Sequence, residues 1–405
     1  MALTQRELID PPVMPNVQRL QSLDVFRGAT IAGMILVNNP GSWSHIYPPL
    51  RHAEWHGVTP TDLIFPFFLF IVGVAIPFAL AARRARLGDQ DDIAPLVRKI
   101  FLRSAALFGI GLLLHMIPTR LPSSDSSGNG FFDMQNLRIM GVLQRIALCY
   151  LAAGMLSVLF SWRGLLAWAM VLMTVYSVLI LAVPVPGNGA GDLSIEGNLA
   201  THIDSAVFGT HNYRTLRAGE LYWEPEGLLS TLPAIGTTLL GALTGLWLRS
   251  GRGAMQKAAG LFAAGVVCAV LGYVLDGLLM PINKGLWTPA YVFLTAGFAL
   301  LGLGLCYWLI DVHRYQKWSK LLMIFGMNAL AMFVLAAIVS RVMVLIAWAD
   351  EEGKRVALRG FLYNTLYTPL FKDPKNASLA WAISYVLVFL LIALALYRKR
   401  IFIKV

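Results

Sequence analysis

Residues 60–82 read PTDLIFPFFLFIVGVAIPFALAA and contain a single charged side chain, Asp62. An apolar block of about 20 residues is long enough to cross the hydrocarbon core of a bilayer as a helix. Because lipid offers the backbone no hydrogen-bond partners, a block that crosses it must be helical. The stretch therefore predicts a transmembrane helix.

Similar blocks recur along the whole chain, which is 57 % hydrophobic and only 14 % charged. Soluble domains carry nearer to about 25 % charged residues. We therefore predict an all-α fold, a polytopic transmembrane helical bundle of about ten spans. The predicted spans are 23–39, 60–82, 99–117, 137–160, 164–183, 227–248, 257–280, 289–310, 321–347 and 379–397. The block 356–371 is too short and polar to span, and is interpreted as an interfacial or re-entrant helix.

The distribution of basic residues predicts the orientation. With both termini in the cytoplasm, the larger share of the 33 Lys and Arg residues falls on the inner side, as the positive-inside rule requires. Residues 1–22 then form a cytoplasmic segment that lacks the pattern of a cleavable signal. A single domain occupies 23–400, and 401–405 is a cytoplasmic tail. The long outer loops are 40–59, 118–136, 184–226 and 348–378, and long loops are often functional.

Composition also excludes several classes of function. The net charge of +11 does not indicate nucleic-acid binding, because the basic residues lie in short loops between apolar blocks, where topology explains them. Cys149, Cys268 and Cys306 lie inside those blocks without the spacing of a disulfide framework or zinc cluster, and we interpret them as small buried residues. The absence of an internal repeat argues against inverted-repeat transporters.

Polar residues at membrane depth are the most informative feature, because charged side chains inside spans normally face the protein interior or a water-filled cavity. The first span places Asp24 and Arg27 three residues apart on one helical face, and it ends with Asn38 and Asn39. The alternative for Asp24 and Arg27 is an intrahelical ion pair at the inner interface.

The outer loop that follows contains three histidines, His45, His52 and His56, with Glu54 and Asp62 nearby. A histidine accepts a proton near neutral pH, and a carboxylate can orient its ring. Zinc binding and solvent-facing histidines are the alternatives, but the loop has neither an HExxH motif nor a cysteine.

Further polar residues follow at the predicted outer ends of later spans. Gln144 and Arg145 lie near the outer end of the fourth span, where an arginine requires an anion or a carboxylate partner such as Glu226 or Asp276. Glu224 and Glu226 precede the sixth span, where acidic residues also favour helix N-termini.

The turn after the seventh span supplies Asn283, Lys284 and Trp287, although Trp287 also fits an aromatic belt. Asn328 lies inside the ninth span, where an amide either joins helices or contacts a ligand. Taken together, these polar residues predict a shared cavity that opens to the outer face.

The motifs that carry these residues resemble the heparan-α-glucosaminide N-acetyltransferase family from about residue 18 to the C-terminus. The most specific is HAEWHGVTPTDLIFPFFLFIVG at 52–73. The others are SLDVFRG (22–28), VNNPG (37–41), GVLQRIA (141–147), EPEGLLSTLP (224–233), PINKGLWT (281–288) and GMNAL (326–330). The chain looks like a short bacterial member without the N-terminal lumenal domain of the lysosomal enzyme.

The resemblance implies an acyltransferase that passes the acetyl group of cytosolic acetyl-CoA to the amine of a glucosamine-type sugar on the outer face of a bacterial inner membrane. It implies His52, Asn38 and Asp24 as the catalytic residues, no metal, and a possible homodimer. It also suggests a larger set of substrate- or cofactor-binding residues: Arg27, Asn39, Trp55, Asp62, Gln144, Arg145, Glu226, Asn283, Lys284, Trp287 and Asn328.

Two chemical schemes and two rival functions stay open at this stage. His52 acts either as a general base or as an acetyl carrier, with Asn38 or backbone amides at the oxyanion. The basic loops 83–103, 249–257 and 311–320 would attract the phosphates of CoA. The rival functions are an O-acetyltransferase of an envelope polysaccharide and an amino-sugar transporter.

Overall fold

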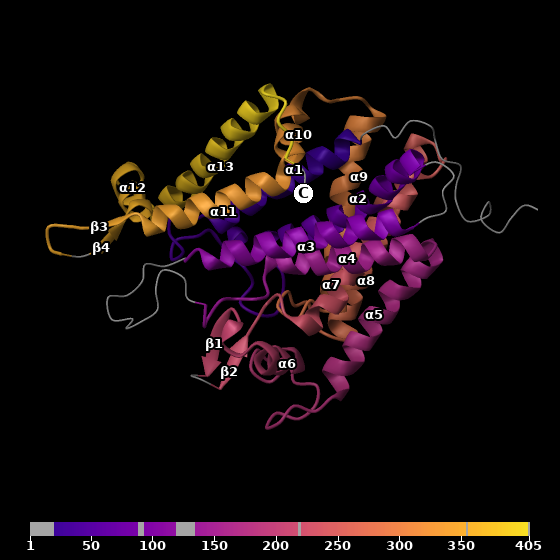
Figure 1. The fold of residues 1–405 in the computed structure, drawn as a ribbon, viewed down its shortest axis with the longest axis horizontal. Helices are drawn as coiled ribbons and strands as arrows, with labels where there is room; N and C mark the ends of the chain where they lie inside the picture. The colour runs from indigo at the N-terminus through magenta and orange to yellow at the C-terminus, as the bar shows by residue number, and fades with distance from the viewer. Residues whose placement is uncertain (1–19, 88–92, 119–133, 218–219, 354, 404–405) are drawn as a thin grey trace, which may run out of the picture.

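The computed structural model describes residues 20–87, 93–118, 134–217, 220–353 and 355–403, and it is built mainly from long helices (Figure 1). The helices that coincide with predicted spans are α1 (Gln21–Asn38), α2 (Ile64–Leu87), α3 (Ala94–Met116), α4 (Val142–Leu159), α5 (Trp162–Ala182), α7 (Leu228–Arg249), α8 (Ala254–Leu278), α9 (Pro289–Tyr307), α10 (Lys320–Met327) with α11 (Ala329–Leu345), and α13 (Pro374–Arg398). Every predicted span is therefore matched by helix.

Length and apolar composition support a smaller number of membrane crossings than this correspondence suggests. Among the described residues seven helices are long and apolar enough to cross, or eight if the pair α10 and α11 forms one span. The helices α1 and α3 are not among them. In α1 the side chains of Asp24, Arg27 and Asn38 lower the hydropathy. The chain is thus a polytopic helical protein, while ten crossings and cytoplasmic termini stay predictions.

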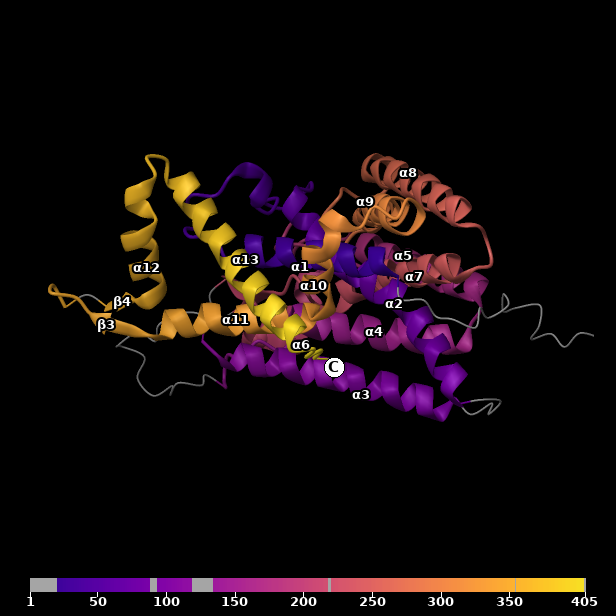
Figure 2. The ribbon, with the colours of Figure 1, turned by 90° about the horizontal axis from the view of Figure 1, so that it is seen from above.

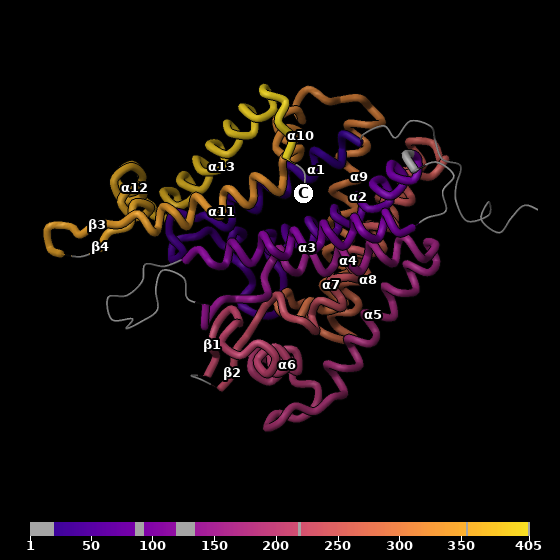
Figure 3. The backbone as a smooth tube through the Cα atoms, in the orientation of Figure 1, coloured from indigo at the N-terminus to yellow at the C-terminus, as the bar shows by residue number. Residues whose placement is uncertain are grey.

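The predicted span 321–347 is wrong as a single straight helix. It is broken at Asn328, where α10 and α11 meet at a bend of 68°, and Figure 3 follows the chain through this break. The amide of Asn328 donates to the carbonyl of Ile401 at 3.1 Å and accepts from the N–H of Ile403 at 2.9 Å. Asn328 therefore ties the break to the segment that follows α13.

The outer loops contain secondary structure, so the prediction of an all-α fold needs a correction. Loop 184–226 holds α6 (Leu199–Phe208) and an antiparallel hairpin of β1 (Arg214–Arg217) and β2 (Leu221–Trp223), which lie together below the bundle in Figure 1. A second hairpin joins β3 (Ala347–Ala349) to β4 (Arg355–Ala357), and α12 (Leu358–Leu366) follows. Short 3₁₀ and π turns occupy Pro48–Leu50, Pro60–Leu63, Gly209–His211, Trp308–Val312, Lys317–Ser319 and Thr368–Leu370.

The polarity of these loop sequences explains why they fold outside the bundle. The helix predicted within 356–371 is present as α12, but its placement at a membrane interface stays a prediction. Most of the predicted loop 118–136 and the first 19 residues lie outside the described part of the chain.

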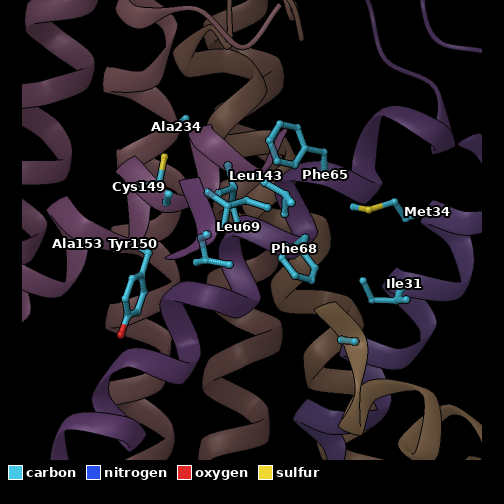
Figure 4. Close-up of a cluster of buried hydrophobic side chains, with 14 of the residues drawn as sticks. Ile31, Met34, Phe65, Phe68, Leu69, Leu143, Cys149, Tyr150, Ala153 and Ala234 are labelled. Atoms are coloured by element: carbon cyan, nitrogen blue, oxygen red, sulfur yellow. The ribbon is translucent and has the colours of Figure 1, made fainter. Parts of the chain in front are cut away.

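The largest buried cluster joins α1, α2, α4 and α7 (Figure 4). Phe65, Phe68 and Leu69 of α2 meet Leu143 and neighbouring side chains of α4 there. Glycines allow α2 and α7 to approach closely: a Cβ on Gly241 would lie 2.2 Å from the carbonyl oxygen of Phe70. This packing fixes the N-terminal ends of α2 and α7 side by side, and the polar site is built on those ends.

Cys149 is fully buried in this cluster and all three cysteines are free thiols. Cys268 and Cys306 are half-buried. The interpretation of the cysteines as apolar packing residues is therefore confirmed for Cys149, and it holds in part for the other two.

Candidate active site

His52 and Asp62 form the centre of the site. His52 lies in the loop 40–59, and Asp62 lies in the short turn Pro60–Leu63 that leads into α2. The ring Nδ1 of His52 is 2.6 Å from Oδ1 of Asp62. The side chain of His52 is 47 % exposed whereas that of Asp62 is 1 % exposed, so a buried carboxylate holds a ring that solvent reaches.

The local sequence fixes Asp62 in this position. Its Oδ2 accepts hydrogen bonds from the N–H of Ala53 at 3.0 Å, the N–H of Thr59 at 3.1 Å and the hydroxyl of Thr59 at 3.0 Å. Thr59 and Asp62 thereby form a capping box at the start of the helix. One carboxylate therefore both caps the helix and orients the histidine.

Lys284 reaches the same carboxylate from the turn between α8 and α9. Its Nζ is 3.3 Å from Oδ1 of Asp62 and 2.9 Å from Nδ1 of His52. The neighbouring Asn283 is fully buried, and its amide oxygen accepts the N–H of Leu286 at 2.8 Å. Asn283 thus shapes the turn that presents Lys284.

The loop and this turn are also joined through their backbones. The N–H of Gly57 donates to the carbonyl of Ile282 at 2.7 Å, next to a bridge between His56 and Asn283. Gly57 has a φ of 95°, in the left-handed region that favours glycine. Segments more than 200 residues apart in sequence therefore meet in one rigid unit.

The contacts assign the proton on the ring of His52. An ionised carboxylate only accepts hydrogen bonds and an ammonium only donates them. The contact of Nδ1 with Oδ1 of Asp62, at 2.6 Å, is shorter than its contact with Nζ of Lys284, at 2.9 Å. A bare Nδ1 would set two lone pairs against each other at the shorter contact, so we infer that Nδ1 carries the hydrogen. Lys284 then pairs with the carboxylate. Nε2 of His52 keeps its lone pair and lies on the exposed side of the ring, where it can accept a proton or attack a carbonyl carbon.

A layer of large buried side chains supports this centre from below. The hydroxyl of Tyr291 in α9 donates to the backbone carbonyl of Asp62. The ring of Trp287 packs edge-on against Tyr291 and Phe65, with centroids 5.2 Å apart in both pairs. Trp287 is 1 % exposed, so its interpretation as part of an aromatic belt is wrong. Its φ of 54° is strained for a bulky residue, and such strain often marks functional positions.

Arg145 lies beneath Trp287, with its guanidinium carbon 5.1 Å from the ring centroid. It is fully buried, and it donates to the carbonyl of Gly227 at 3.1 Å and to the hydroxyl of Ser230. The suggested ion pair with Glu226 or Asp276 is absent among the described residues. Asp276 instead accepts the N–H of Ile282 at 2.6 Å. The Nε and one terminal nitrogen of Arg145 have no hydrogen-bond partner within the described chain.

Sequence reasoning missed Arg138, which binds both Glu224 and Glu226. Its Nε is 2.8 Å from Glu224, and one terminal nitrogen contacts both carboxylates. Burial raises the pKa of Glu224 to about 7, against the attraction of Arg138. For Glu226 the effect of burial is outweighed by Arg138 and Arg145, which lower its pKa. The run EPE at 224–226 was the available signal, but its partner is 86 residues away.

The interpretation of Glu224 and Glu226 as helix caps is also wrong. Asp204 of α6 accepts the N–H of Leu228, the first residue of α7, at 2.8 Å. Burial raises the pKa of Asp204 to about 6. Asp204 and Arg138 together fasten loop 184–226 onto the bundle.

Trp55 brings the same loop to the histidine. Its indole N–H donates to the carbonyl of Leu193 at 2.8 Å, and its ring lies edge-on to Trp223 of β2 with centroids 6.1 Å apart. Gly285 allows the close approach, since a Cβ there would lie 2.7 Å from the ring of Trp55. Trp55 therefore connects the loop that carries His52 to loop 184–226.

Other predicted site residues lie apart from this centre. Asp24 and Arg27 pair at 3.1 Å near the opposite end of α1 from Asn38, roughly 21 Å away at 1.5 Å per residue. The structure therefore does not bring Asp24 to His52. Asn38 is exposed at the outer end of α1, and its role as a donor stays a prediction.

Two further amides have mainly structural contacts. Asn39 is buried and donates to the carbonyl of Ile35 at 2.9 Å. Gln144 is fully buried with its Nε2 3.4 Å from Nδ1 of His115, and its Oε1 has no partner among the described residues.

Comparison with known proteins places these residues in a family. The profile described as "Heparan-alpha-glucosaminide N-acetyltransferase, catalytic" matches residues 19–274. The human protein named heparan-alpha-glucosaminide N-acetyltransferase is 28 % identical over 364 residues, which cover 78 % of this chain and 52 % of the human one. The mouse protein of the same name is 27 % identical over 440 residues, covering 96 % of this chain and 61 % of its own.

The chain thus spans between half and two thirds of the length of these relatives. The matched region contains His52, Asp62, Arg145 and Glu226, whereas Lys284 lies beyond it. The chain belongs to the family of heparan-alpha-glucosaminide N-acetyltransferase catalytic domains.

Proposed function

We propose that this protein is a transmembrane acyltransferase that moves the acetyl group of cytosolic acetyl-CoA to the amine of a glucosamine-type sugar at the outer face of a bacterial inner membrane. The names of the human and mouse relatives support the reaction class. The observation that carries the proposal is the arrangement of His52, Asp62 and Lys284, which leaves one ring nitrogen free at an exposed position.

In the direct scheme Nε2 of His52 removes a proton from the ammonium of the sugar. The freed amine attacks the thioester carbonyl carbon, the C–N bond forms, and the C–S bond breaks. The CoA thiolate leaves and takes up a proton. Asp62 accepts the Nδ1 hydrogen throughout, so it fixes the ring orientation and stabilises the imidazolium. A general base of this kind contributes a factor of about 10²–10⁴ to the rate.

The negative charge on the thioester oxygen requires a donor. Asn38 at the end of α1 is our candidate, and one such donor typically contributes about 3 kcal/mol. The ammonium of Lys284, held 2.9 Å from the histidine ring, supplies a positive charge close to the reacting centre.

The second scheme uses His52 as the acetyl carrier. Nε2 attacks the thioester carbon, CoA leaves as thiolate, and the acetyl-imidazole then transfers its acyl group to the sugar amine. The same free nitrogen serves both schemes. Transient labelling of His52 by acetyl-CoA in the absence of sugar distinguishes them.

Around this centre we assign binding roles to the residues that line or support it. Trp55 and Asn283 belong to the two segments that meet beside His52, and Trp287 lies beneath them with Arg145. Glu226 and Gln144 are buried further in. The CoA phosphates would be held at the cytoplasmic ends of the helices, where loops 249–257 and 311–320 are basic. The remaining residues would contribute indirectly. Asp24, Arg27 and Asn39 would set the position of α1, and Asn328 would set the bend between α10 and α11. A homodimer is the proposed assembly.

The decisive experiment is acetyl transfer by the purified protein, with radiolabelled acetyl-CoA and glucosamine. We expect wild type to form N-acetylglucosamine and His52→Ala to be inactive. His45→Ala is the matched control, because His45 is an exposed histidine of the same loop that contacts only Ser42. Retained turnover in His52→Ala contradicts both schemes.

Two further arms test the rival functions. Product formed on a sugar whose amine is already acetylated favours O-acetylation of hydroxyl groups. Uptake of labelled glucosamine into proteoliposomes without acetyl-CoA favours a transporter. The intramembrane arginine Arg145 with two unpaired nitrogens is the feature that a transporter would share.

A further inference from the structure

A groove of 750 Å³ lies between the C-terminal end of α2 and the N-terminal half of α3, at the end of the bundle remote from His52. Its lining carries four basic residues, Arg83 of α2 and Arg98, Lys99 and Arg103 of α3, and no carboxylate from the described part of the chain. The rest of the lining is apolar and includes Leu102. The groove is therefore a positively charged recess with an apolar wall.

The basic residues of α3 form one stripe. Arg98 and Leu102 are four residues apart, as are Lys99 and Arg103, so the two pairs lie side by side along the part of α3 that lines the groove. Arg83, Arg98 and Arg103 form no ion pair with any described residue. The Nε of Arg83 is buried and has no hydrogen-bond partner within the described chain. Three guanidinium groups thus line the groove without an ion-pair partner among the described residues, and that of Arg103 lies 5.0 Å from the ring centroid of Tyr150.

The position of the groove indicates which side its ligand comes from. Figure 2 shows α3 along one edge of the bundle, with α4 next to it. Beside the stripe, Phe101 and Leu102 are 60 % and 55 % exposed, as expected for side chains that face lipid. On the protein side of α3, Ile100 and Leu107 belong to the buried cluster, whose members Tyr150, Ala153 and Phe65 are drawn in Figure 4.

We propose that this groove binds the phosphate of an anionic phospholipid headgroup. Guanidinium groups bind phosphate through paired hydrogen bonds, and basic recesses between helices at the cytoplasmic surface suit anionic headgroups. The apolar wall at Leu102 and the exposed Phe101 would contact the acyl chains. The site rests on the proposed membrane orientation but does not depend on acetyl transfer.

The phosphates of CoA offer the same chemistry, and the sequence alone assigned loop 83–103 to them. The structure favours lipid for two reasons. The groove lies beside exposed apolar side chains, and the buried cluster extends from Ile100 of α3 to Phe65 of α2, three residues after Asp62. A pantetheine arm that began in the groove would have to cross that cluster to reach His52.

The test is retention of phosphatidylglycerol by the purified full-length protein, measured by native mass spectrometry. Arg98→Gln combined with Arg103→Gln should lower retention on the order of ten-fold, since each basic side chain adds to the attraction. Retention of phosphatidylcholine should not change. Arg398→Gln combined with Lys399→Gln, at the end of α13, is the charge-matched control and should retain phosphatidylglycerol like wild type.

Two further measurements distinguish a phospholipid headgroup from CoA as the ligand of the groove. Acetyl-CoA affinity of the groove variant should equal that of wild type; a weakened affinity with unchanged lipid retention overturns the proposal in favour of CoA. Equal retention of phosphatidylglycerol by wild type and the groove variant overturns it outright. If the groove variant does not fold, competition on wild type decides: displacement of the lipid by CoA contradicts the proposal, and displacement only by a second anionic lipid supports it.

Discussion

Two charged clusters at the same end of the bundle each combine carboxylates with basic side chains, but they differ in exposure. His52, Asp62 and Lys284 surround a ring that is 47 % exposed and leave its Nε2 free. Glu224 and Glu226 are buried and share one arginine, Arg138, whose side chain is 20 % exposed. In the first cluster a ring nitrogen is accessible to a substrate, whereas in the second the buried carboxylates are already paired with an arginine.

The difference shows what each cluster can do. A carboxylate that orients a histidine prepares it to exchange a proton. An arginine that binds two buried carboxylates from a distant loop has a structural role, so it holds loop 184–226 on the bundle. Removing one partner of such a network leaves an unpaired buried charge, which is expensive. Substitutions in the two clusters should therefore separate activity from stability.

Asp62→Asn tests whether the carboxylate that orients His52 is needed for acetyl transfer, and it should have the largest effect. The amide would keep the shape of the turn but no longer hold the histidine in the right tautomer, so we expect acetyl transfer to fall by about 10²–10⁴-fold. Rate measurements under saturating acetyl-CoA would show it. Asp373→Asn, at the exposed N-terminal cap of α13, should remain fully active. Near-normal turnover of Asp62→Asn would remove Asp62 from the mechanism.

Arg138→Gln tests the structural cluster. It leaves two buried carboxylates without their cation, so the free energy of unfolding should fall by about 3–5 kcal/mol. Thermal melting in detergent measures the loss, and limited proteolysis should show cleavage in loop 184–226 first. Arg217→Gln is the control, because Arg217 forms an exposed pair with Glu196 in the same loop. A variant that keeps its stability but loses turnover would move Arg138 into the reaction.

Glu224→Gln tests whether the stability of the Arg138 cluster depends on pH. The pKa of Glu224 is raised from 4.5 to about 7 by burial, so the folded protein binds this proton more tightly than the unfolded chain. Its contribution to stability is complete below about pH 4.5 and is lost as the pH rises to about 7, by up to about 3 kcal/mol.

The measurement is the difference in melting temperature between wild type and Glu224→Gln from pH 4.5 to 8. Wild type should lose stability relative to the variant as the pH rises through this window. A difference that is constant with pH would show that Glu224 has an ordinary pKa in the folded protein.

Lys284→Gln should have the smallest effect. The glutamine keeps a donor near Asp62 but removes the charge, so we expect about a ten-fold lower kcat with an unchanged melting temperature. Lys375→Gln is the control, because Lys375 is an outer lysine that lies over the ring of Tyr47 instead. A change in the KM for the sugar without a change in kcat would assign Lys284 to acceptor binding.

Much of the fold was predictable from composition alone. Each apolar block corresponds to helix, and the polar stretch 356–371 holds a short one, because local apolar content and length decide whether a segment forms a long helix. The break at Asn328 was not predictable, since the sequence through it is uniformly apolar apart from the amide. The bend exists because the tail after α13 supplies hydrogen bonds for that amide.

The candidate site was predictable only in its parts. The motif around His52 and Asp62 is local, and a spacing of ten residues closed by a turn brings the two together. Lys284 was named as a binding residue, but its contact with both depends on the α8–α9 turn. Arg138 could not be paired with Glu224 and Glu226, because nothing in the sequence connects positions so far apart.

The sequence by itself determined the class of protein, the helical blocks and the choice of His52 as the candidate histidine, because these depend on local hydropathy and on short motifs. The tertiary structure alone decided which charged side chains are paired with one another and which remain accessible to a substrate. It buried Trp287 and Arg145 beneath the site, separated Asp24 from His52 by most of the length of α1, and joined Arg138 to two carboxylates. Such pairings depend on distances between segments remote in sequence, and only the packing of the helices sets those distances.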